Sequence, residues 1–471
     1  MSLERIDHIV VLMLENRSFD HMLGYLSLEG GRDDVDGLRA DMANAHEGRT
    51  YPVHHLEATH IPDAHWDPDH SGTATDHQIN RGRMDGFASS YAATLAHRKV
   101  PNADPGVVMG YFNAGDLPVY DHLATEFCVC DAWHASVPGA TWPNRLYAIT
   151  GGADGSRDDK PTPPPLYDRH SFVRHLDAHG VDWRWYTYDV GTLRCADRDY
   201  LVGHHHRFAY VDRLKLRWEI GALEHLVVDE DSASFIEDAT RGRLAPVSWI
   251  DPNFKDLNLA HADSNDDHPP SDVGAGQELV FNVYNAIAAG GLWDRTLLIV
   301  TYDEHGGFHD HVPPPEAVDD DPEHFGRYGV RVPALVVSPW VAPRSVSHEL
   351  FDHTSIIATI LRRFCPEELQ ERHGAREILH WLRPGHPHYM GKRVAAANDL
   401  GSLLGADAPR PAPDRTALVE WLAHRHAARG RKLATDPVVR PAEQRRVNDL
   451  QAGIISAATH MRANGLPPGQ P

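Results

Sequence analysis

Residues 6–16 read Ile-Asp-His-Ile-Val-Val-Leu-Met-Leu-Glu-Asn, an apolar run that ends abruptly in polar side chains. Such a near-continuous run is typical of a parallel strand that is buried on both faces of its sheet. In open α/β sheets, functional groups collect beyond the carboxyl ends of such strands. The stretch therefore predicts a central strand and, directly after it at residues 15–21, one edge of a site.

Two further stretches repeat this pattern. Residues 296–302 (TLLIVTY) are apolar and run into Asp303 and Glu304, and residues 332–338 (VPALVVS) form a third apolar run. Helical patterns cover residues 277–289 and 352–364, the latter with Asp352 as the candidate N-cap. This alternation of strands and helices predicts an α/β fold with a mostly parallel sheet flanked by helices.

The rest of the chain suggests an insertion and a tail. Residues 1–410 are expected to form one domain, interrupted at about 30–107 by a loop-rich, polar and histidine-rich insertion that supplies a lid or a site wall. A proline-containing linker at 409–413 would separate a helical C-terminal extension, residues 411–471. Within the extension, helices are expected over 416–429 and 442–464.

Composition limits the classes of partner. The 471 residues include 67 Asp and Glu against 45 Lys and Arg, a formal net charge of −22. An acidic surface repels phosphate backbones, and no basic cluster is evident, so no nucleic-acid partner is expected. No apolar run has transmembrane length, and no signal peptide is apparent, so we expect a cytoplasmic protein, or a secreted one if a leader has been removed. The four cysteines are expected to be buried free thiols.

Two polar pairs at strand ends are candidate metal ligands. Glu15 and Asn16 follow the first strand, and Asp303 and Glu304 follow the second. Carboxylate and amide oxygens are hard ligands that suit a divalent cation, and three crowded carboxylates would repel one another without one. Such a ligand set suits Mg²⁺, Mn²⁺ or Ca²⁺, and nearby histidines leave Zn²⁺ open. The alternative is two unrelated polar strand ends, one of which caps a helix.

Residues 136–145 (SVPGATWPNR) contain a candidate nucleophile. Thr141 follows turn residues and precedes an expected helix start, where free N–H groups and the helix dipole favour phosphate. Arg145 lies close enough along the chain to bind a phosphate oxygen. On these residues alone, a simple N-capping role for Thr141 is equally compatible with the pattern.

The 34 histidines include several that could bind a metal, donate to a phosphate or act as a general acid. Surface scatter explains most histidines outside a motif equally well. The candidates near polar or turn motifs are His77, His268, the triplet His204, His205 and His206, the pair His309 and His311, and His353.

Taken in order, the polar stretches resemble the family of bacterial phosphatidylcholine-type phospholipases C and a related acid phosphatase. The resemblance covers about residues 4 to 365 and leaves the tail beyond 411 without a counterpart. The matching stretches are 6–25 with ENRSFDH, 77–87 with MDGF, 116–118, 136–151 with PNRLY, 251–254, 302–315 and 352–355.

The resemblance implies an alkaline-phosphatase-like three-layer sandwich and assigns roles residue by residue. It implies one divalent metal ion bound by Glu15, Asn16, Asp303 and Glu304, and a nucleophilic Thr141 that also touches the metal. It further implies that His77, His268 and one histidine of the triplet, with His205 as the choice, lie near the phosphate with Arg145.

The expected activity is metal-dependent hydrolysis of a phosphate ester, most simply cleavage of a phosphodiester in the manner of phospholipase C, with a phospholipid as one candidate substrate. The alternatives are an acid phosphatase that acts on monoesters, and a non-catalytic protein that binds phosphoesters or metal. A sulfatase is disfavoured because Thr141 cannot be converted to formylglycine. A phospholipase would need an apolar rim, for which Trp66, Phe87, Tyr91 and Trp142 are the candidates.

Overall fold

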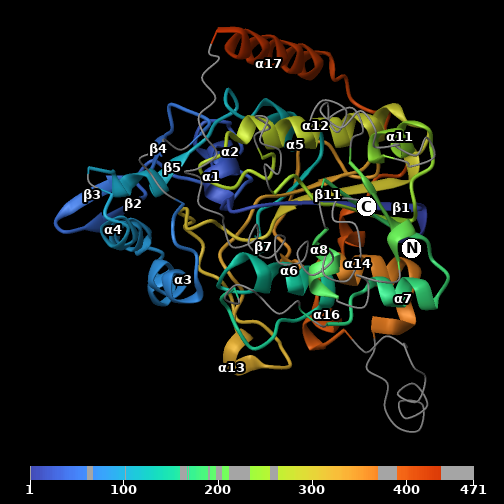
Figure 1. Cartoon of the computed structure of the whole chain (residues 1–471), viewed down its shortest axis with the longest axis horizontal. Coiled ribbons are helices and arrows are strands. Elements are labelled where there is room, and N and C mark those ends of the chain that lie inside the picture. The colour runs from blue at the N-terminus through green and yellow to red at the C-terminus, as the bar shows by residue number, and fades with distance from the viewer. Residues whose placement is uncertain are drawn as a thin grey trace.

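The computed structural model describes residues 2–60, 67–100, 102–159, 167, 169–188, 191–197, 204–211, 234–254, 264–369 and 390–435. Within these residues the centre is an eight-stranded sheet (Figure 1). In spatial order its strands are β13 (Ser345–Ser347), β6 (Cys128–Cys130), β12 (Ala334–Val337), β11 (Thr296–Tyr302), β1 (His8–Leu14), β10 (Val247–Ile250), β8 (Trp183–Thr187) and β9 (Phe208–Tyr210).

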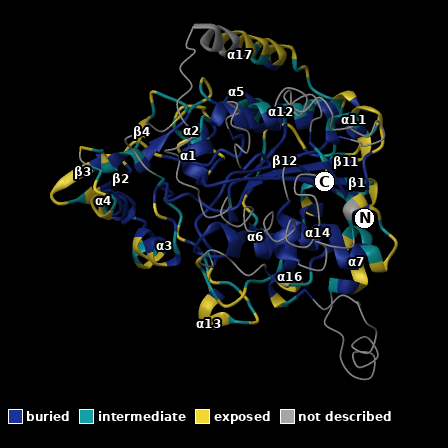
Figure 2. Ribbon diagram, in the orientation of Figure 1, coloured by how far each residue is buried: buried dark blue, intermediate teal, exposed yellow. Residues whose placement is uncertain are grey.

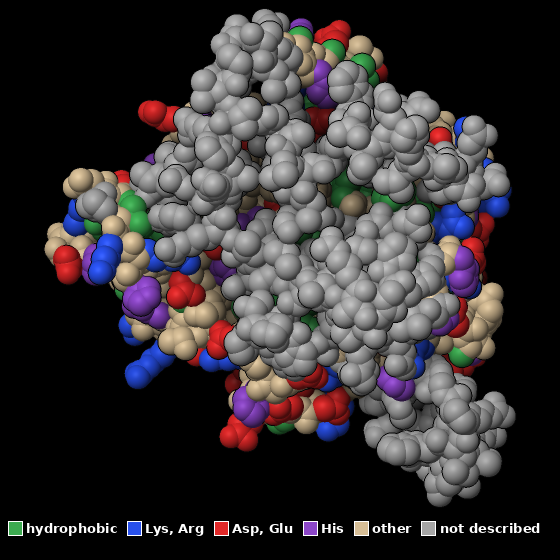
Figure 3. Space-filling view, viewed as in Figure 1, with side chains coloured by type: hydrophobic (Ala, Val, Ile, Leu, Met, Phe, Trp, Pro, Cys, Tyr) green, Lys and Arg blue, Asp and Glu red, His purple; other side chains and the backbone are tan. Residues whose placement is uncertain are grey.

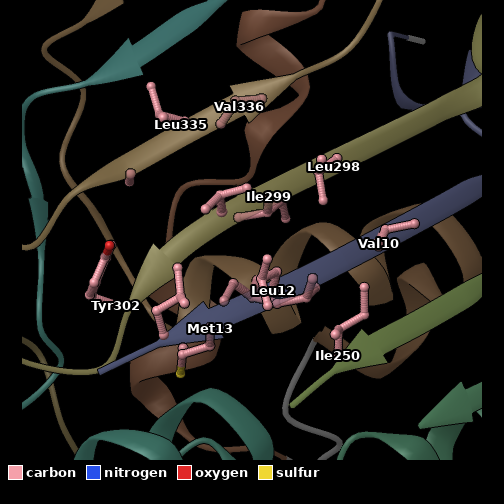
Figure 4. Close-up of a cluster of buried hydrophobic side chains, with 14 of the residues drawn as sticks. Val10, Leu12, Met13, Ile250, Leu298, Ile299, Tyr302, Leu335 and Val336 are labelled. Carbon is pink, nitrogen blue, oxygen red and sulfur yellow. The ribbon is translucent and has the colours of Figure 1, made fainter. Parts of the chain in front are cut away.

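The sheet is mostly parallel, as the alternation of strands and helices predicts. Only β12, among the described strands of this sheet, runs antiparallel to its neighbours β11 and β6. Every residue of β11 and all but the first of β1 are buried, because both faces of the sheet are covered (Figure 2). Side chains of the central strands interlock in the apolar core, as Leu12, Ile299 and Val336 illustrate (Figure 4).

Helices cover the two faces of the sheet, which gives three layers (Figure 1). On one face lie α5 (Pro118–Glu126), α11 (Phe235–Thr240) and α12 (Val273–Ala289). On the other lie α6 (Thr141–Thr150), α7 (Val173–Ala178), α8 (Thr192–Ala196), α14 (Thr354–Phe364) and α16 (Lys392–Ala396). The expected three-layer α/β fold is thus confirmed. One detail differs: Asp352 lies in β14 (Phe351–Asp352), which pairs with β7 (Trp133–His134), and His353 is the N-cap of α14.

The insertion is more ordered than its polar sequence predicts. It contains the hairpin of β2 (Ala43–His46) and β3 (Arg49–Pro52), β4 (His54–His55), α3 (Gly72–Ile79), α4 (Phe87–His97) and the 3-10 helix η3 (Pro105–Met109). These elements share a small apolar core of their own, which includes Phe87, Tyr91 and Met109. Apolar side chains spaced along α4 supply that core, a pattern obscured by the polar residues around it.

The C-terminal extension begins as a helix, α17 (Thr416–Thr435), that packs on the first layer above α12 (Figure 1). Leu418 is buried against the core, and Arg425 forms an ion pair with Asp272, the N-cap of α12, at 2.9 Å. The helix predicted at 442–464 lies outside the described residues. No helix in the described part of the chain has the length and apolarity needed to cross a membrane.

Register between β1 and β11 decides where the polar strand ends lie. The two strands pair in parallel from His8 opposite Thr296 to Leu14 opposite Tyr302. The next residues in each strand, Glu15 and Asp303, are therefore at the same level of the sheet. The sheet itself thus brings the two predicted ligand pairs together at its carboxyl edge.

Candidate active site

The two polar pairs at the ends of β1 and β11 meet as the sequence predicts. The side chains of Glu15, Asn16, Asp303 and Glu304 are all fully buried. The Asn16 backbone N–H donates to Asp303 Oδ1 at 3.1 Å, which links the two strand ends directly. Asn16 adopts a left-handed backbone (φ 61°), which asparagine tolerates better than most residues.

A glycine allows the second strand end to pack against the first. A Cβ atom at Gly306 would lie 2.1 Å from the Asn16 carbonyl oxygen, so no side chain fits there. Gly306 also has a positive φ of 63°, and its N–H donates to Glu304 Oε2 at 2.7 Å. The turn after β11 therefore fixes the Glu304 carboxylate against Asn16.

Several oxygens in this cluster have no hydrogen-bond donor among the described residues. They are both carboxylate oxygens of Glu15, Asn16 Oδ1, Glu304 Oε1 and Asp266 Oδ2. Buried acceptors are normally satisfied, so such a set of unsatisfied oxygens calls for a ligand that supplies positive charge. Carboxylate and amide oxygens grouped in this way fit a divalent cation of the hard class.

The pKa values of the clustered carboxylates also indicate that the cluster needs a positive charge. Burial raises the pKa of Glu15 well above its ordinary value, and the charges of Asp303 and Asp266 raise it further. Burial likewise raises the pKa of Glu304 to about 8, although His70 opposes the rise. Without a cation, Glu15 and Glu304 are thus held in an environment that raises the pKa of each and favours its protonated form.

Asp266 is a carboxylate that the sequence reasoning did not select. Its backbone carbonyl accepts a hydrogen bond from the Glu15 N–H at 2.8 Å, and its Oδ1 accepts from the His268 N–H at 2.9 Å. It thus connects the end of β1 to the loop that carries His268. The available signal was the pair Asp266-Asp267 beside His268, which sequence reasoning treated only as the surroundings of the histidine.

Arg145 joins the cluster from α6. Its Nε donates to Asp303 Oδ2 at 3.0 Å, and its Nη2 lies 3.7 Å from Glu15 Oε1. Burial lowers the pKa of Arg145, but Asp303 and Glu15 outweigh burial and raise the pKa overall. The guanidinium also lies over the Phe254 ring at 4.8 Å, and its Nη1 has no partner among the described residues. Arg145 therefore retains one donor for a further ligand.

Thr141 lies at the start of the same helix, one turn before Arg145 and on the same helical face. Ala140, not Thr141, occupies the N-cap position, and it makes no side-chain capping hydrogen bond. The Thr141 side chain is 2% exposed, and its hydroxyl has no hydrogen bond within the described structure. The simple capping role considered for Thr141 is therefore not what this helix uses.

Two histidines border the cluster, and one of them was not predicted. His70 Nε2 lies 3.3 Å from Asn16 Nδ2 and 3.9 Å from Glu304 Oε1. The His268 ring lies 6.4 Å from the His70 ring, and its Nδ1 is 2.6 Å from the Pro269 carbonyl oxygen. The carbonyl contact makes Nδ1 the donor, which leaves Nε2 as the proton-exchanging nitrogen. His268 thus lies where the sequence predicts it, beside the less expected His70.

His77 does not join the cluster. It lies on the exposed face of α3, and its Nε2 is 2.9 Å from the Ser89 hydroxyl. The next residue, Gln78, is the buried one, and it contacts His305 Nε2 at 2.7 Å. Because one position on a helix changes direction by about 100°, the motif around His77 brings Gln78 rather than His77 toward the site.

The histidine triplet also lies elsewhere. His204 Nε2 is 3.7 Å from Asp177 Oδ2, and Asp177 precedes β8. The 3-10 turn η4 (His205–Arg207) precedes β9, which runs parallel to β8, so the turn lies at the amino edge of the sheet. The side chain of His205 is outside the described residues. The backbone position corrects the assignment of this triplet to the carboxyl-edge site.

A second group of metal-ligating side chains consists of Asp20, Asp310 and His311, whose ligand atoms lie within 4.8 Å of one another. Here a positive charge is already present. Arg331 donates Nη2 to Asp20 Oδ1 at 3.1 Å and Nε to Asp310 Oδ1 at 2.9 Å. His311 Nδ1 lies 2.7 Å from Asp20 Oδ2. The group is therefore a buried ion-pair network that ties the loop after β11 to α1 (Phe19–Leu23).

Comparisons with known proteins identify the family of this chain. The Phosphoesterase family model matches residues 6–365. Non-specific phospholipase C1 of Arabidopsis thaliana is 33% identical over 392 residues, which cover 76% of this chain and 67% of the relative. Non-specific phospholipase C4 of the same plant is 32% identical, covering 86% and 73%. Phospholipase C B of Mycobacterium tuberculosis is 30% identical, covering 76% and 73%.

Solved structures give weaker likenesses. A protein in the alkaline phosphatase superfamily from Vibrio parahaemolyticus is 14% identical, with 54% of this chain and 61% of that chain covered and a TM-score of 0.29. Phosphonate monoester hydrolase SpPMH from Silicibacter pomeroyi is also 14% identical with a TM-score of 0.29, covering 53% and 68%. The fold assignment rests on the sheet described above, and the family assignment on the sequence matches. The chain belongs to the phosphoesterase family of phosphoester-hydrolysing enzymes.

Proposed function

We propose that this protein is a metal-dependent phosphodiesterase of the phospholipase C type, with Thr141 as its nucleophile. The observation that carries the proposal is the group of buried oxygens without donors on Glu15, Asn16, Glu304 and Asp266. Arg145 contacts this group through Glu15 and Asp303, and Thr141 lies one turn before Arg145 on the same helix. Glu15, Asn16, Asp303 and Glu304 would hold one divalent cation. When bound, the cation neutralises these carboxylates and supplies Lewis-acid activation of the phosphoryl oxygen and of the attacking hydroxyl.

The remaining steps follow from the side chains. Thr141 Oγ1 releases its proton to solvent and attacks phosphorus, while the bond from phosphorus to the alcohol oxygen breaks. Arg145 donates its spare Nη1–H to a phosphoryl oxygen as charge develops. His268 Nε2, with Nδ1 anchored by the Pro269 carbonyl, gives a proton to the departing alkoxide. Water then attacks phosphorus in the phosphothreonine, and the bond between phosphorus and Thr141 Oγ1 breaks. The Thr141 hydroxyl is restored with a proton from that water, and His268 regains its proton from solvent.

The apolar rim expected of a phospholipase is not formed by the described candidates, Phe87, Tyr91 and Trp142. Phe87 and Tyr91 lie in the core of the insertion, and Trp142 is 3% exposed, so none of the three forms a rim around the site. Trp66 lies outside the described residues. On the face in Figure 3, the visible basic side chains are interspersed with acidic ones and histidines. Because none of the described candidates forms an apolar rim for acyl chains, the first test uses substrates that differ at the phosphate and headgroup rather than in an acyl chain.

The test compares a diester with a monoester. Chelator-treated protein is assayed on p-nitrophenyl phosphorylcholine and p-nitrophenyl phosphate, with each divalent metal restored in turn. We expect metal-dependent release from the diester. Dominant release from the monoester would favour the acid phosphatase alternative, and no release with any metal would favour a binding protein.

The nucleophile is tested with Thr141→Val and Thr141→Ser. The valine variant should fold normally but lose activity by at least about 1000-fold, because no other hydroxyl takes over the attack. The serine variant should retain measurable activity and accumulate a covalent phosphoryl group detectable by intact-protein mass spectrometry. Substantial activity of Thr141→Val would exclude the covalent mechanism.

A further inference from the structure

A carboxylate occupies the N-terminus of the helix that carries the proposed nucleophile. Trp142 is the residue after Thr141, and its backbone N–H donates to Asp159 Oδ1 at 2.8 Å. Covalent geometry places the Thr141 hydroxyl within about 4 Å of that nitrogen, and hence within roughly 7 Å of the Asp159 carboxylate. The N–H group that sequence reasoning left available for phosphate is therefore already paired with a negative side chain.

The backbone holds Asp159 in this position. The Ala140 N–H donates to the Arg157 carbonyl oxygen at 2.9 Å, so residues 157–159 run beside the start of α6. A Cβ atom at Gly139 would lie 2.1 Å from that same carbonyl oxygen, so the close approach needs glycine. The Arg157 side chain makes two further hydrogen bonds to Asp76 of α3, at 2.8 and 2.6 Å. The carboxylate is thus fixed from both sides.

An anion is expected in the same place for independent reasons. Arg145, buried one turn along α6, has an Nη1 without a partner among the described residues. The Thr141 hydroxyl also has no hydrogen bond there. A phosphoryl group that reaches both would come close to the carboxylate of Asp159.

We infer that Asp159 is a specificity-determining residue, which makes the site select singly charged phosphodiesters over doubly charged phosphomonoesters. The inference rests on the proposed function and names its substrate class. A phosphomonoester carries close to two negative charges above its second pKa of about 6, whereas a diester carries one. A fixed carboxylate repels the dianion twice as strongly and offsets part of the positive field of the helix N-terminus.

Asp159→Asn tests the inference with little structural change. Asparagine keeps an oxygen acceptor for the Trp142 N–H and removes the charge. At pH 8, kcat/KM for p-nitrophenyl phosphate should rise about tenfold relative to kcat/KM for p-nitrophenyl phosphorylcholine, as expected for removal of one repulsive charge at this distance. An unchanged ratio would overturn the inference.

Asp158→Asn is the matched control. Asp158 is the neighbouring residue and loses the same charge, but its Oδ1 accepts from the Gly72 N–H of α3 at 2.6 Å rather than from α6. Its monoester-to-diester ratio should equal that of the wild type. An equal rise in both variants would mean that overall charge, not the position of Asp159, sets the preference, and would also overturn the inference.

Inhibition gives a second readout that does not need fast turnover. Asp159→Asn should tighten inhibition by inorganic phosphate, mostly a dianion at pH 8, about tenfold more than it tightens inhibition by dimethyl phosphate, a monoanion. Wild-type protein that hydrolyses neither ester refutes the proposed function, and the inference with it. Wild-type diesterase activity with unaltered ratios and inhibition in Asp159→Asn refutes the inference alone.

Discussion

At the scale of single residues, the buried Glu15 carboxylate is expected to lower the free energy of unfolding of the metal-free protein. Burial and the charges of Asp303 and Asp266 raise the pKa of Glu15, so its ionised form destabilises the metal-free fold at neutral pH. Glu15→Gln should therefore stabilise the chelator-treated protein, by roughly 1 to 3 kcal/mol in urea unfolding, while lowering activity at least about 100-fold. Loss of stability in the metal-free variant would contradict this reading of the cluster.

His134, which lies away from the site, is expected to make the stability of the fold depend on pH. Burial lowers its pKa to about 3, although a hydrogen bond to the Gly329 carbonyl opposes the shift. Because the folded pKa lies below the unfolded value of about 6.5, the stabilisation is complete above pH 6.5 and is lost as pH falls. The loss should be about 1.4 kcal/mol per pH unit down to about pH 3.

His134→Asn should remove this pH dependence, because asparagine can still donate to Gly329 but does not titrate. The difference in unfolding free energy between wild type and variant should move by about 2 kcal/mol in favour of the variant between pH 6.5 and 5. Chemical denaturation at the two pH values measures it. A difference that stays constant with pH would show that His134 does not couple folding to protonation.

At the scale of elements, α17 is docked through the buried Leu418 and the partly buried Trp421 and Leu422. Leu418 is 4% exposed, whereas Val419, its neighbour on the same helix, is 51% exposed. Leu418→Ala should weaken docking by about 2 to 3 kcal/mol and speed proteolysis within α17 several-fold. Val419→Ala should change neither measurement. Equal proteolysis of the two variants would mean that Leu418 is dispensable and that other contacts, such as the Arg425–Asp272 ion pair, hold the helix.

At the scale of the whole molecule, cation binding should stabilise the fold in a pH-dependent manner. The pKa of Glu304 is raised to about 8, mainly by burial, so a bound cation must displace its proton at neutral pH. Affinity should therefore rise by up to about tenfold per pH unit between pH 6 and 8. The thermal midpoint at saturating metal should increase by several degrees over the chelated protein, and by more at pH 8 than at pH 6. A pH-independent midpoint shift would argue against these ligands.

The sheet could be predicted from the sequence because its strands are buried on both faces. The apolar runs at 6–14 and 296–302 correspond to β1 and β11, and the polar pairs after them meet in the structure. The antiparallel course of β12 could not be predicted, since its apolar residues are compatible with either direction. The ends of strands are thus the part of the site that local pattern encodes.

The walls of the site were predicted less well. His70 and Asp159 come from loops whose positions depend on contacts with distant residues, such as the contact of His70 with Asn16 and the pairing of Arg157 with Ala140. Local pattern carries no record of such contacts. The motif around His77 does lie near the site, but the sequence did not reveal which face of its helix points inward. In the structure the neighbouring Gln78, rather than His77, faces the site and contacts His305.

The pairing of β1 with β11 has a consequence for how this enzyme could be re-engineered. Asn16 and Asp303 are 287 positions apart along the chain, yet they lie just beyond the ends of two paired strands, which run about 4.8 Å apart. The hairpin of β2 and β3 in the insertion lies outside this ladder, so we expect changes in its length to leave the carboxylates in place. The sheet therefore fixes the carboxylates, whereas the insertion supplies His70. A segment grafted in place of the insertion would have to provide its own counterpart of His70.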